Sequence, residues 1–249
     1  MNNRRAIALD INPMAVFLVN SVISPVDYDE FFKSFERIKN EFYKNEPKND
    51  LDIERIIKKY KHPIGIKLPK SSDVDTVELL FNKKQTAQLA LLRYLINKEK
   101  NDNIRKSFLL MLSGLVTRFN KTYHASTYNK KENGNAAPFM YYRYRIAREE
   151  LDLDLMKYFT LRYNKVLAAK KEMEYFINKD TIDNIKVMKG SATDLSFLPN
   201  ESVDYIYTDP PYGKKIPYLD LSIMWNAWLD LEYLKNDKFL SFPTFRFLT

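Results

Sequence analysis

The chain opens with a short apolar run that leads at once into a helix-start signal. Residues 5–10, RAIALD, are typical of a β-strand. The residues that follow, INP, offer Asn12 as a helix N-cap and Pro13 as the first helical residue. The pattern predicts a strand that is followed directly by a helix.

From Pro25 to about Asn178 the apolar residues recur at spacings of three and four, the period of amphipathic helices. Two polar stretches interrupt the pattern, KHPIGIKLPKSSD and NKTYHASTYNKKENGNAAP, and we expect both to be loops. The predicted helical segments are YDEFFKSFERIKNEFY, LDIERIIKKY, VELLFNKKQTAQLALLRYLINK, IRKSFLLMLSGLVTRF and REELDLDLMKYFTLRYNKVLAAKKEMEYFI.

Strand signals return after residue 184. IKVMKG and VDYIYTDP are predicted strands, and YLDLSIMWNAWLDLEYL is a further amphipathic segment. The two ends of the chain therefore indicate an α/β sheet, and the middle indicates a helical insertion. We divide the chain into residues 1–24 and 181–249, which form the two parts of the sheet region, and residues 25–180, which form the insertion.

The composition predicts a folded protein of the reducing cytoplasm. With 249 residues, of which 45% are hydrophobic, the chain can fill a sizeable core. It has no cysteine and two histidines, so we expect no disulfide and no metal site. No apolar run reaches the roughly 18 residues of a membrane helix, so we expect no membrane partner.

The net charge of +8 suggests a polyanionic partner, with nucleic acid as the first candidate. Abundant Lys, Asn, Ile, Tyr and Phe would also follow from coding bias in an AT-rich genome, but residues 98–148 alone hold eleven basic residues against three acidic ones. These side chains could track DNA phosphates or could form an ordinary solvated face. The candidates in the insertion are Arg118, Lys121, Lys130, Lys131, Arg143 and Arg145.

All three predicted strands end in polar or acidic residues. The first ends at Asp10, the second at the turn of residues 190–194, and the third at Asp209. Ligands of open α/β sheets bind at the carboxyl ends of the strands. This edge is therefore the candidate site.

The last of these strands ends in the tetrapeptide Asp209, Pro210, Pro211 and Tyr212. The Asp209 carboxylate and the Pro210 carbonyl are two acceptors that could hold both N–H groups of an exocyclic amine. They would free its lone pair and stabilise the positive charge that develops during methyl transfer. The prolines fix the backbone, and Tyr212 could stack on a base swung out of a duplex.

DPPY after a VDYIYT strand resembles the motif of S-adenosylmethionine-dependent amino-methyltransferases, which methylate adenine N6 or cytosine N4 in DNA. IPYLDLSIMWNAWL is similar to the helix after DPPY in a subgroup of bacterial site-specific DNA methyltransferases, some of which belong to restriction-modification systems. The resemblance covers about a third of the chain, at its two ends. It implies a partial Rossmann-like class I methyltransferase sheet with a large helical insertion.

The resemblance also implies cofactor-binding residues. RRAIALDINP resembles the strand and turn in which an acid holds the cofactor ribose, which maps to Asp10, with Ile11 beside the adenine. In the common pattern an acid follows the glycine that corresponds to Gly190. Here Ser191 stands in that place and Asp194 comes three residues later, so either could contact the adenine amino group. Lys214 and Lys215 could hold the phosphates beside a flipped base.

The family also has a glycine-rich turn after its first strand, and none of the five glycines forms a GxG pair. The chain opens on what resembles the second strand, so we expect a complementing polypeptide to carry the first strand and its turn. Without it, we expect weak or no cofactor binding.

Two other functions are compatible with the sequence. RNA guanine-N2 methyltransferases carry a DPPY-like turn, and a non-catalytic DNA-binding remnant or subunit would keep the basic helices. A DNA adenine-N6 methyltransferase is the leading hypothesis.

Overall fold

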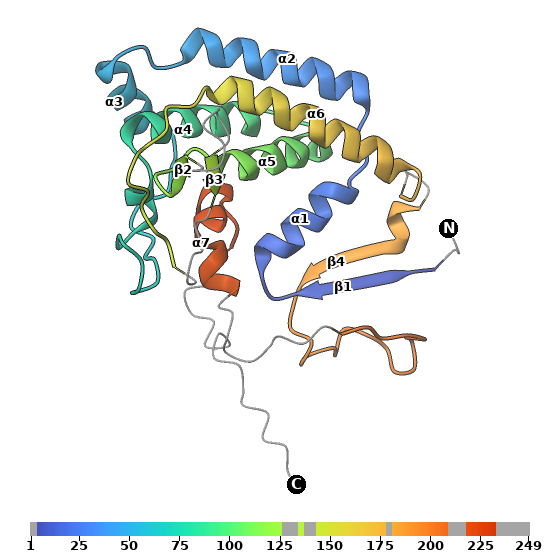
Figure 1. The fold of residues 1–249 in the computed structure, drawn as a ribbon. Helices are drawn as coiled ribbons and strands as arrows, with labels where there is room; N and C mark the ends of the chain where they lie inside the picture. The colour runs from blue at the N-terminus through green and yellow to red at the C-terminus, as the bar shows by residue number, and fades with distance from the viewer. Residues whose placement is uncertain (1–3, 126–133, 137–142, 178–180, 209–217, 233–249) are drawn as a thin grey trace.

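The protein is mixed α/β, with mostly helices and one small parallel sheet (Figure 1). The computed structural model describes residues 4–125, 134–136, 143–177, 181–208 and 218–232. The strands are β1 (Ala6–Asp10), β2 (Tyr123–Ala125), β3 (Gly134–Ala136) and β4 (Ile185–Lys189). The α-helices are α1 (Pro13–Ile23), α2 (Tyr28–Asn45), α3 (Asp50–Lys59), α4 (Lys83–Asn97), α5 (Asp102–Val116), α6 (Leu155–Glu174) and α7 (Tyr218–Leu229), and short 3-10 turns lie at Val77–Leu80 and Ile182–Asn184.

The parallel sheet joins the two ends of the sequence. β1 pairs with β4 in a register that sets Ala6 opposite Ile185 and Asp10 opposite Lys189. The predicted strand over residues 5–10 and the predicted strand IKVMKG are both confirmed. The start of α1 is confirmed as well, because the Asn12 side chain accepts a hydrogen bond from the Met14 amide and Pro13 opens the helix.

The helical middle forms because its polar residues start helices and its apolar residues share one face. Each of five helices begins after an Asn or Asp whose side chain accepts a backbone N–H of the first turn, and Asn82 and Gln85 form a complete capping box. α6 starts at Leu155, after the cap Asp154, and not at the head of the predicted segment REELDLDL. The five caps are Asp27, Asn49, Asn82, Asn101 and Asp154.

One hydrophobic core runs through the helices. Phe31 of α2, Phe108 of α5 and Phe159 of α6 are fully buried. The rings of Phe31 and Phe108 are 4.9 Å apart, within the range of favourable aromatic pairs. Met14 of α1 and Trp228 of α7 belong to the same cluster, so the helices next to the sheet share their core with the insertion. The proposed boundaries at residues 24 and 180 stay a prediction.

The predicted strand VDYIYTDP is wrong for the residues that the structure describes. Residues 201–208 are exposed and carry no helix or strand. Tyr205, Ile206 and Tyr207 have exposed fractions of 80%, 69% and 80%. A strand is defined by its partner, and this segment pairs with none of the described strands, so its apolar alternation is not enough to make it one.

The polar stretch from Asn120 to Pro138 is not purely a loop either. β2 and β3 lie within it and pair antiparallel, with Tyr123 opposite Ala136. Three-residue strands are too short to show alternation in a sequence. These two strands are therefore recognised only from their backbone pairing in the structure.

No helix in the described part of the chain could span a membrane. Each of the described helices is too short or too polar to cross a bilayer.

Candidate functional site

The carboxyl ends of β1 and β4 lie together, as the sequence predicts. The Gly190 amide donates a hydrogen bond to the Asp10 carbonyl oxygen, 3.1 Å away, just past the last residue pair of the sheet. Asp10 and the turn of residues 190–194 therefore meet at one edge. In Figure 1 the chain that follows β4 runs below β1, on the side away from β4.

Asp10 is exposed, and one of its two carboxylate oxygens accepts a hydrogen bond from a described residue. Its Oδ1 accepts a hydrogen bond of 2.7 Å from the Asn12 amide, which fixes the carboxylate above the turn into α1. Its Oδ2 has no partner among the described residues. A free carboxylate oxygen at an exposed edge suits the paired hydroxyl groups of a ribose. Ile11, beside it, is half-buried.

Ser191 and Asp194 form a small hydrogen-bonded turn. The Ser191 hydroxyl accepts from the Thr193 amide and lies 2.7 Å from the Thr193 hydroxyl. Oδ1 of Asp194 accepts hydrogen bonds from the hydroxyl and the backbone amide of Ser196, and these bonds lower the pKa of the Asp194 carboxyl. Asp194 is therefore held in its ionised form, and its second oxygen is available to a donor.

The tetrapeptide Asp209, Pro210, Pro211 and Tyr212 lies outside the described residues, as do Lys214 and Lys215. The residues that flank it are described. The Ser222 hydroxyl of α7 lies 3.2 Å from Asn12 Oδ1, which caps α1, and 3.0 Å from the Leu219 carbonyl oxygen, so its one proton is shared between these two acceptors. The helix that follows the tetrapeptide is thus tied to the corner between β1 and α1.

A buried tyrosine that the sequence analysis missed also holds α7. The Tyr144 hydroxyl lies 3.1 Å and 3.0 Å from the carbonyl oxygens of Asp220 and Leu221, and it accepts a hydrogen bond from the Met224 amide. Tyr144 is fully buried. Its position before a polar run carries no pattern that would have separated it from the other sixteen tyrosines.

The four described basic candidates lie in different surroundings. The Arg118 guanidinium lies 5.8 Å and 5.1 Å from the ring centres of Tyr123 and Tyr158, so aromatic faces hold it. Arg143 reaches the Ser71 carbonyl, and Arg145 pairs with Asp73 at 3.3 Å. Lys121 is half-buried, and its backbone bonds to Leu80 and Ala147. Lys130 and Lys131 lie outside the described residues.

A cavity of about 580 Å³ lies between α1, α5, α6 and α7. Arg162 and Lys165 of α6 line it, together with Gly114 of α5 and Trp225 of α7. The sequence analysis assigned no role to Arg162, Lys165 or Gly114. A glycine in the middle of an apolar helix was the signal that could have found this place, since such a glycine often marks a close approach.

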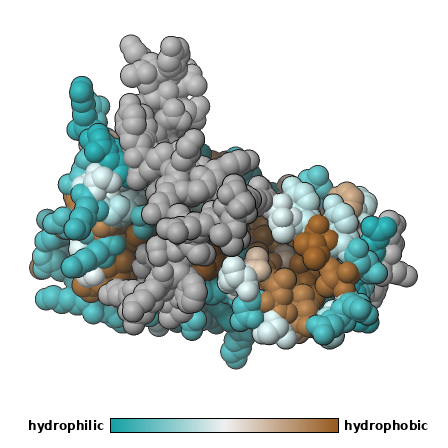
Figure 2. Space-filling model, turned by 90° about the horizontal axis from the view of Figure 1, so that it is seen from below, coloured by the Kyte–Doolittle hydropathy of each residue, from teal (hydrophilic) through white to brown (hydrophobic). Residues whose placement is uncertain are grey.

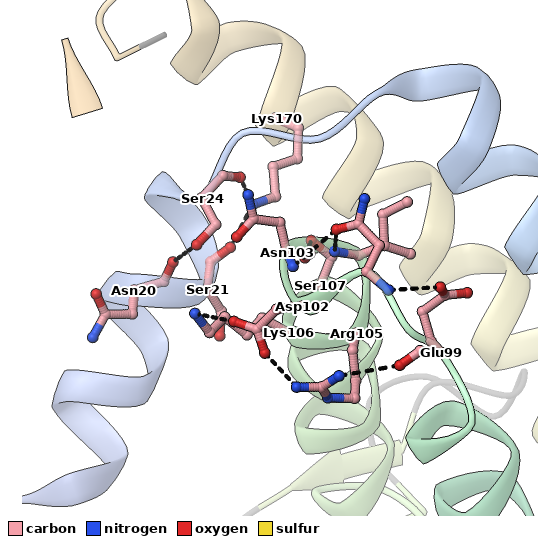
Figure 3. A network of polar contacts seen from close by, with 12 residues as sticks. Asn20, Ser21, Ser24, Glu99, Asp102, Asn103, Arg105, Lys106, Ser107 and Lys170 are labelled. Carbon is pink, nitrogen blue, oxygen red and sulfur yellow. Dashed lines mark hydrogen bonds and ion pairs between the residues drawn. The ribbon is translucent and has the colours of Figure 1, made fainter. Parts of the chain in front are cut away.

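Lys170 of α6 is one of the residues that line this cavity, and it joins α6 to the end of α1 (Figure 3). Its ammonium group donates to the carbonyl oxygens of Ser21, Val22 and Ser24, at the end of α1, over 2.5, 3.2 and 2.5 Å. Burial, with a smaller contribution from the charge of Lys106, lowers the pKa of Lys170 to about 8. The contact satisfies carbonyls that a helix end leaves free.

Within the described residues, no group of three or more histidines and carboxylates is placed to hold a metal ion. Comparison of the chain with protein families, with curated proteins and with solved structures finds no match.

Proposed function

We propose that this chain is part of an S-adenosylmethionine-dependent DNA methyltransferase that modifies the N6 amino group of adenine. The observation that carries the proposal is the meeting of Asp10 and the 190–194 turn at one carboxyl edge, with the helix that follows DPPY tied to the same corner through Asn12. This is the edge at which an α/β sheet binds its ligands.

The residues of this edge fit the cofactor that the motif implies. The unpartnered Oδ2 of Asp10 would accept from the ribose hydroxyls, Ile11 would contact the adenine, and Ser191 or Asp194 would accept from the adenine amino group. When bound, S-adenosylmethionine supplies a methyl group on a positively charged sulfur.

The tetrapeptide would prepare the amine of the target base. The Asp209 carboxylate and the Pro210 carbonyl accept its two N–H groups, and the carboxylate stabilises the positive charge that forms on nitrogen. Pro211 restricts the backbone, and Tyr212 stacks on the extruded base. Lys214 and Lys215 hold the flanking phosphates.

The sheet region supports the need for a complementing polypeptide. Parallel strands are normally buried on both faces, yet four of the five residues of β1 are exposed, and Ile7 has an exposed fraction of 47%. Residues 203–208 are exposed and pair with none of the described strands, and Figure 2 shows hydrophobic surface gathered on this underside of the molecule. A further strand added to the free edge of β1 would pair its backbone and cover these side chains.

The test is methyl transfer by a reconstituted enzyme. The chain is co-expressed with the product of the neighbouring upstream reading frame, and the complex is incubated with methyl-labelled S-adenosylmethionine and either duplex DNA or transfer RNA. We expect N6-methyladenine in DNA and no label in RNA. N2-methylguanine in the RNA arm would assign the chain to the rival RNA enzymes.

Two variants make the test specific. Asp209→Ala should abolish transfer, whereas Asp204→Ala, which removes an exposed carboxylate five residues earlier, should leave it unchanged. DNA binding that survives Asp209→Ala, without methyl transfer by any reconstituted complex, would identify a non-catalytic DNA-binding subunit.

A further inference from the structure

We propose that the cavity between α1, α5, α6 and α7 binds a nucleotide, with the phosphate on Arg162 and Lys165 and the heterocycle against the apolar wall. The choice of a nucleotide, among anions with a flat ring, rests on the proposed function. Among the described residues of the sheet edge, neither Asp10 nor the turn of residues 190–194 lines the cavity, whereas Ser222, which bonds to Asn12, does.

Arg162 is the centre of the proposal because its charge is not compensated. The side chain is half-buried, and it makes neither an ion pair nor a hydrogen bond within the described residues. Burial, together with the nearby charge of Arg118, lowers the pKa of its guanidinium. A guanidinium in such surroundings is stabilised by an anion that offers it two oxygens, as phosphate does.

The fold makes room for this arginine. A Cβ atom on Gly114 would stand 2.6 Å from Arg162 Nε and 2.8 Å from its Cζ, so the guanidinium lies directly across the backbone of α5. Glycine inside a helix costs roughly 1 kcal/mol relative to alanine. A side chain at position 114 would displace the flexible end of Arg162, so the glycine lets the guanidinium lie against the backbone of α5.

The remaining charges also favour an anion. Lys165 lies three residues after Arg162 on the same side of α6, is exposed, and has no partner among the described residues. Lys170 adds positive charge, although its ammonium group already donates hydrogen bonds to three carbonyl oxygens at the end of α1. Among the described residues that line the cavity, none carries a carboxylate.

The opposite wall suits a heterocycle. Met14 and Leu18 of α1 and Leu221 and Trp225 of α7 line it. The Trp225 indole N–H donates to the Ser113 carbonyl and the Thr117 hydroxyl, which holds the ring in place. A volume of about 580 Å³ lies within the range of small-molecule sites, and bases bind readily to aromatic walls.

The same chemistry is offered by a free mononucleotide and by a nucleotide of a DNA strand, so the experiment uses both. The purified full chain is titrated with dAMP and deoxyadenosine by calorimetry, and with a fluorescent single-stranded oligonucleotide by anisotropy. We expect dAMP to bind at least about tenfold more tightly than deoxyadenosine, since the phosphate adds charge-assisted hydrogen bonds. Binding of the oligonucleotide without dAMP would assign the site to DNA strands, and the reverse would assign it to free nucleotides. Binding of neither overturns the proposal.

Three variants test the seat of the phosphate. Arg162→Gln should weaken binding about tenfold, whereas Arg55→Gln, which removes an equal charge from an exposed position on α3, should not. Gly114→Ala keeps every charge but displaces the guanidinium, so it should weaken binding several-fold without lowering the unfolding temperature. Equal affinities for dAMP and deoxyadenosine, or equal effects of the two arginine variants, would overturn the proposal. These measurements need no methyl transfer. The nucleotide site can therefore be disproved while the proposed function stands, and the proposed function can be disproved while the nucleotide site stands.

Discussion

The helices α2 to α6 and the sheet region of β1, β4 and residues 190–208 use their apolar residues in opposite ways. In the helices, Phe31, Phe108 and Phe159 are fully buried. In the sheet region, Ile7 and Ile206 are exposed. A helix satisfies its own backbone and has only to bury one face, whereas a strand also needs neighbours on its edges. Within the part of the chain that the structure describes, the helices complete a core and the sheet region does not.

The largest effect that tests this contrast is the loss of a core ring. Phe108→Ala leaves a cavity beside Phe31 and Phe159 and should lower the free energy of unfolding by about 3–5 kcal/mol. Tyr207→Ala, in the exposed segment, should change it by less than about 0.5 kcal/mol. Urea unfolding followed by circular dichroism measures both. Equal losses would mean that the sheet region is packed as tightly as the helices.

Lys170 joins the helices to α1, which packs on the sheet, and its effect should depend on pH. Below pH 8 both the folded and the unfolded chain carry the proton, so this residue adds no pH dependence. Between pH 8 and 10.5 the unfolded chain holds a proton that the folded chain has lost, so stability should rise by about 1 kcal/mol per pH unit.

The measurement is the difference in unfolding free energy between the wild type and Lys170→Met at pH 7, 8, 9 and 10. Taking the difference removes the titration of the tyrosines, which both proteins share. A flat difference across this range would mean that the pKa of Lys170 is not lowered by its burial.

A smaller effect should come from the cap of α4. Asn82→Ala removes the acceptor of the capping box and should cost about 1 kcal/mol. Asn164→Ala, at an exposed interior position of α6, is the matched control and should be neutral or slightly stabilising. Thermal unfolding compares the two variants. A loss in the control as large as that in Asn82→Ala would contradict the capping contribution.

The smallest effect is expected at the edge of the sheet. Ile7→Ser should change the stability of the chain by less than about 0.5 kcal/mol, because the side chain is already exposed. In the complex with a complementing strand the same change should cost clearly more. An equal cost with and without the partner would show that no strand covers Ile7.

Much of the helical part was predictable because its signals are local. Asn12 and Pro13 mark the start of α1 through contacts within two residues, and the three-and-four spacing of apolar residues marks the other helices. The joining of Asp10 to the 190–194 turn was also predictable, since the carboxyl ends of parallel strands share an edge. The strand predicted over VDYIYTDP failed because its pattern says nothing about whether a partner is present.

The amino-acid sequence alone determined where the helices start, which residues end β1 and β4, and which tetrapeptide can prepare an amine for methylation. These follow from contacts between near neighbours and from the chemistry of single side chains. Only the tertiary structure decided that Arg162 lies on Gly114, that Lys170 closes the end of α1, and that Tyr144 holds α7. Those contacts join residues from 48 to about 150 positions apart, and no spacing along the chain encodes which distant backbone a side chain will meet.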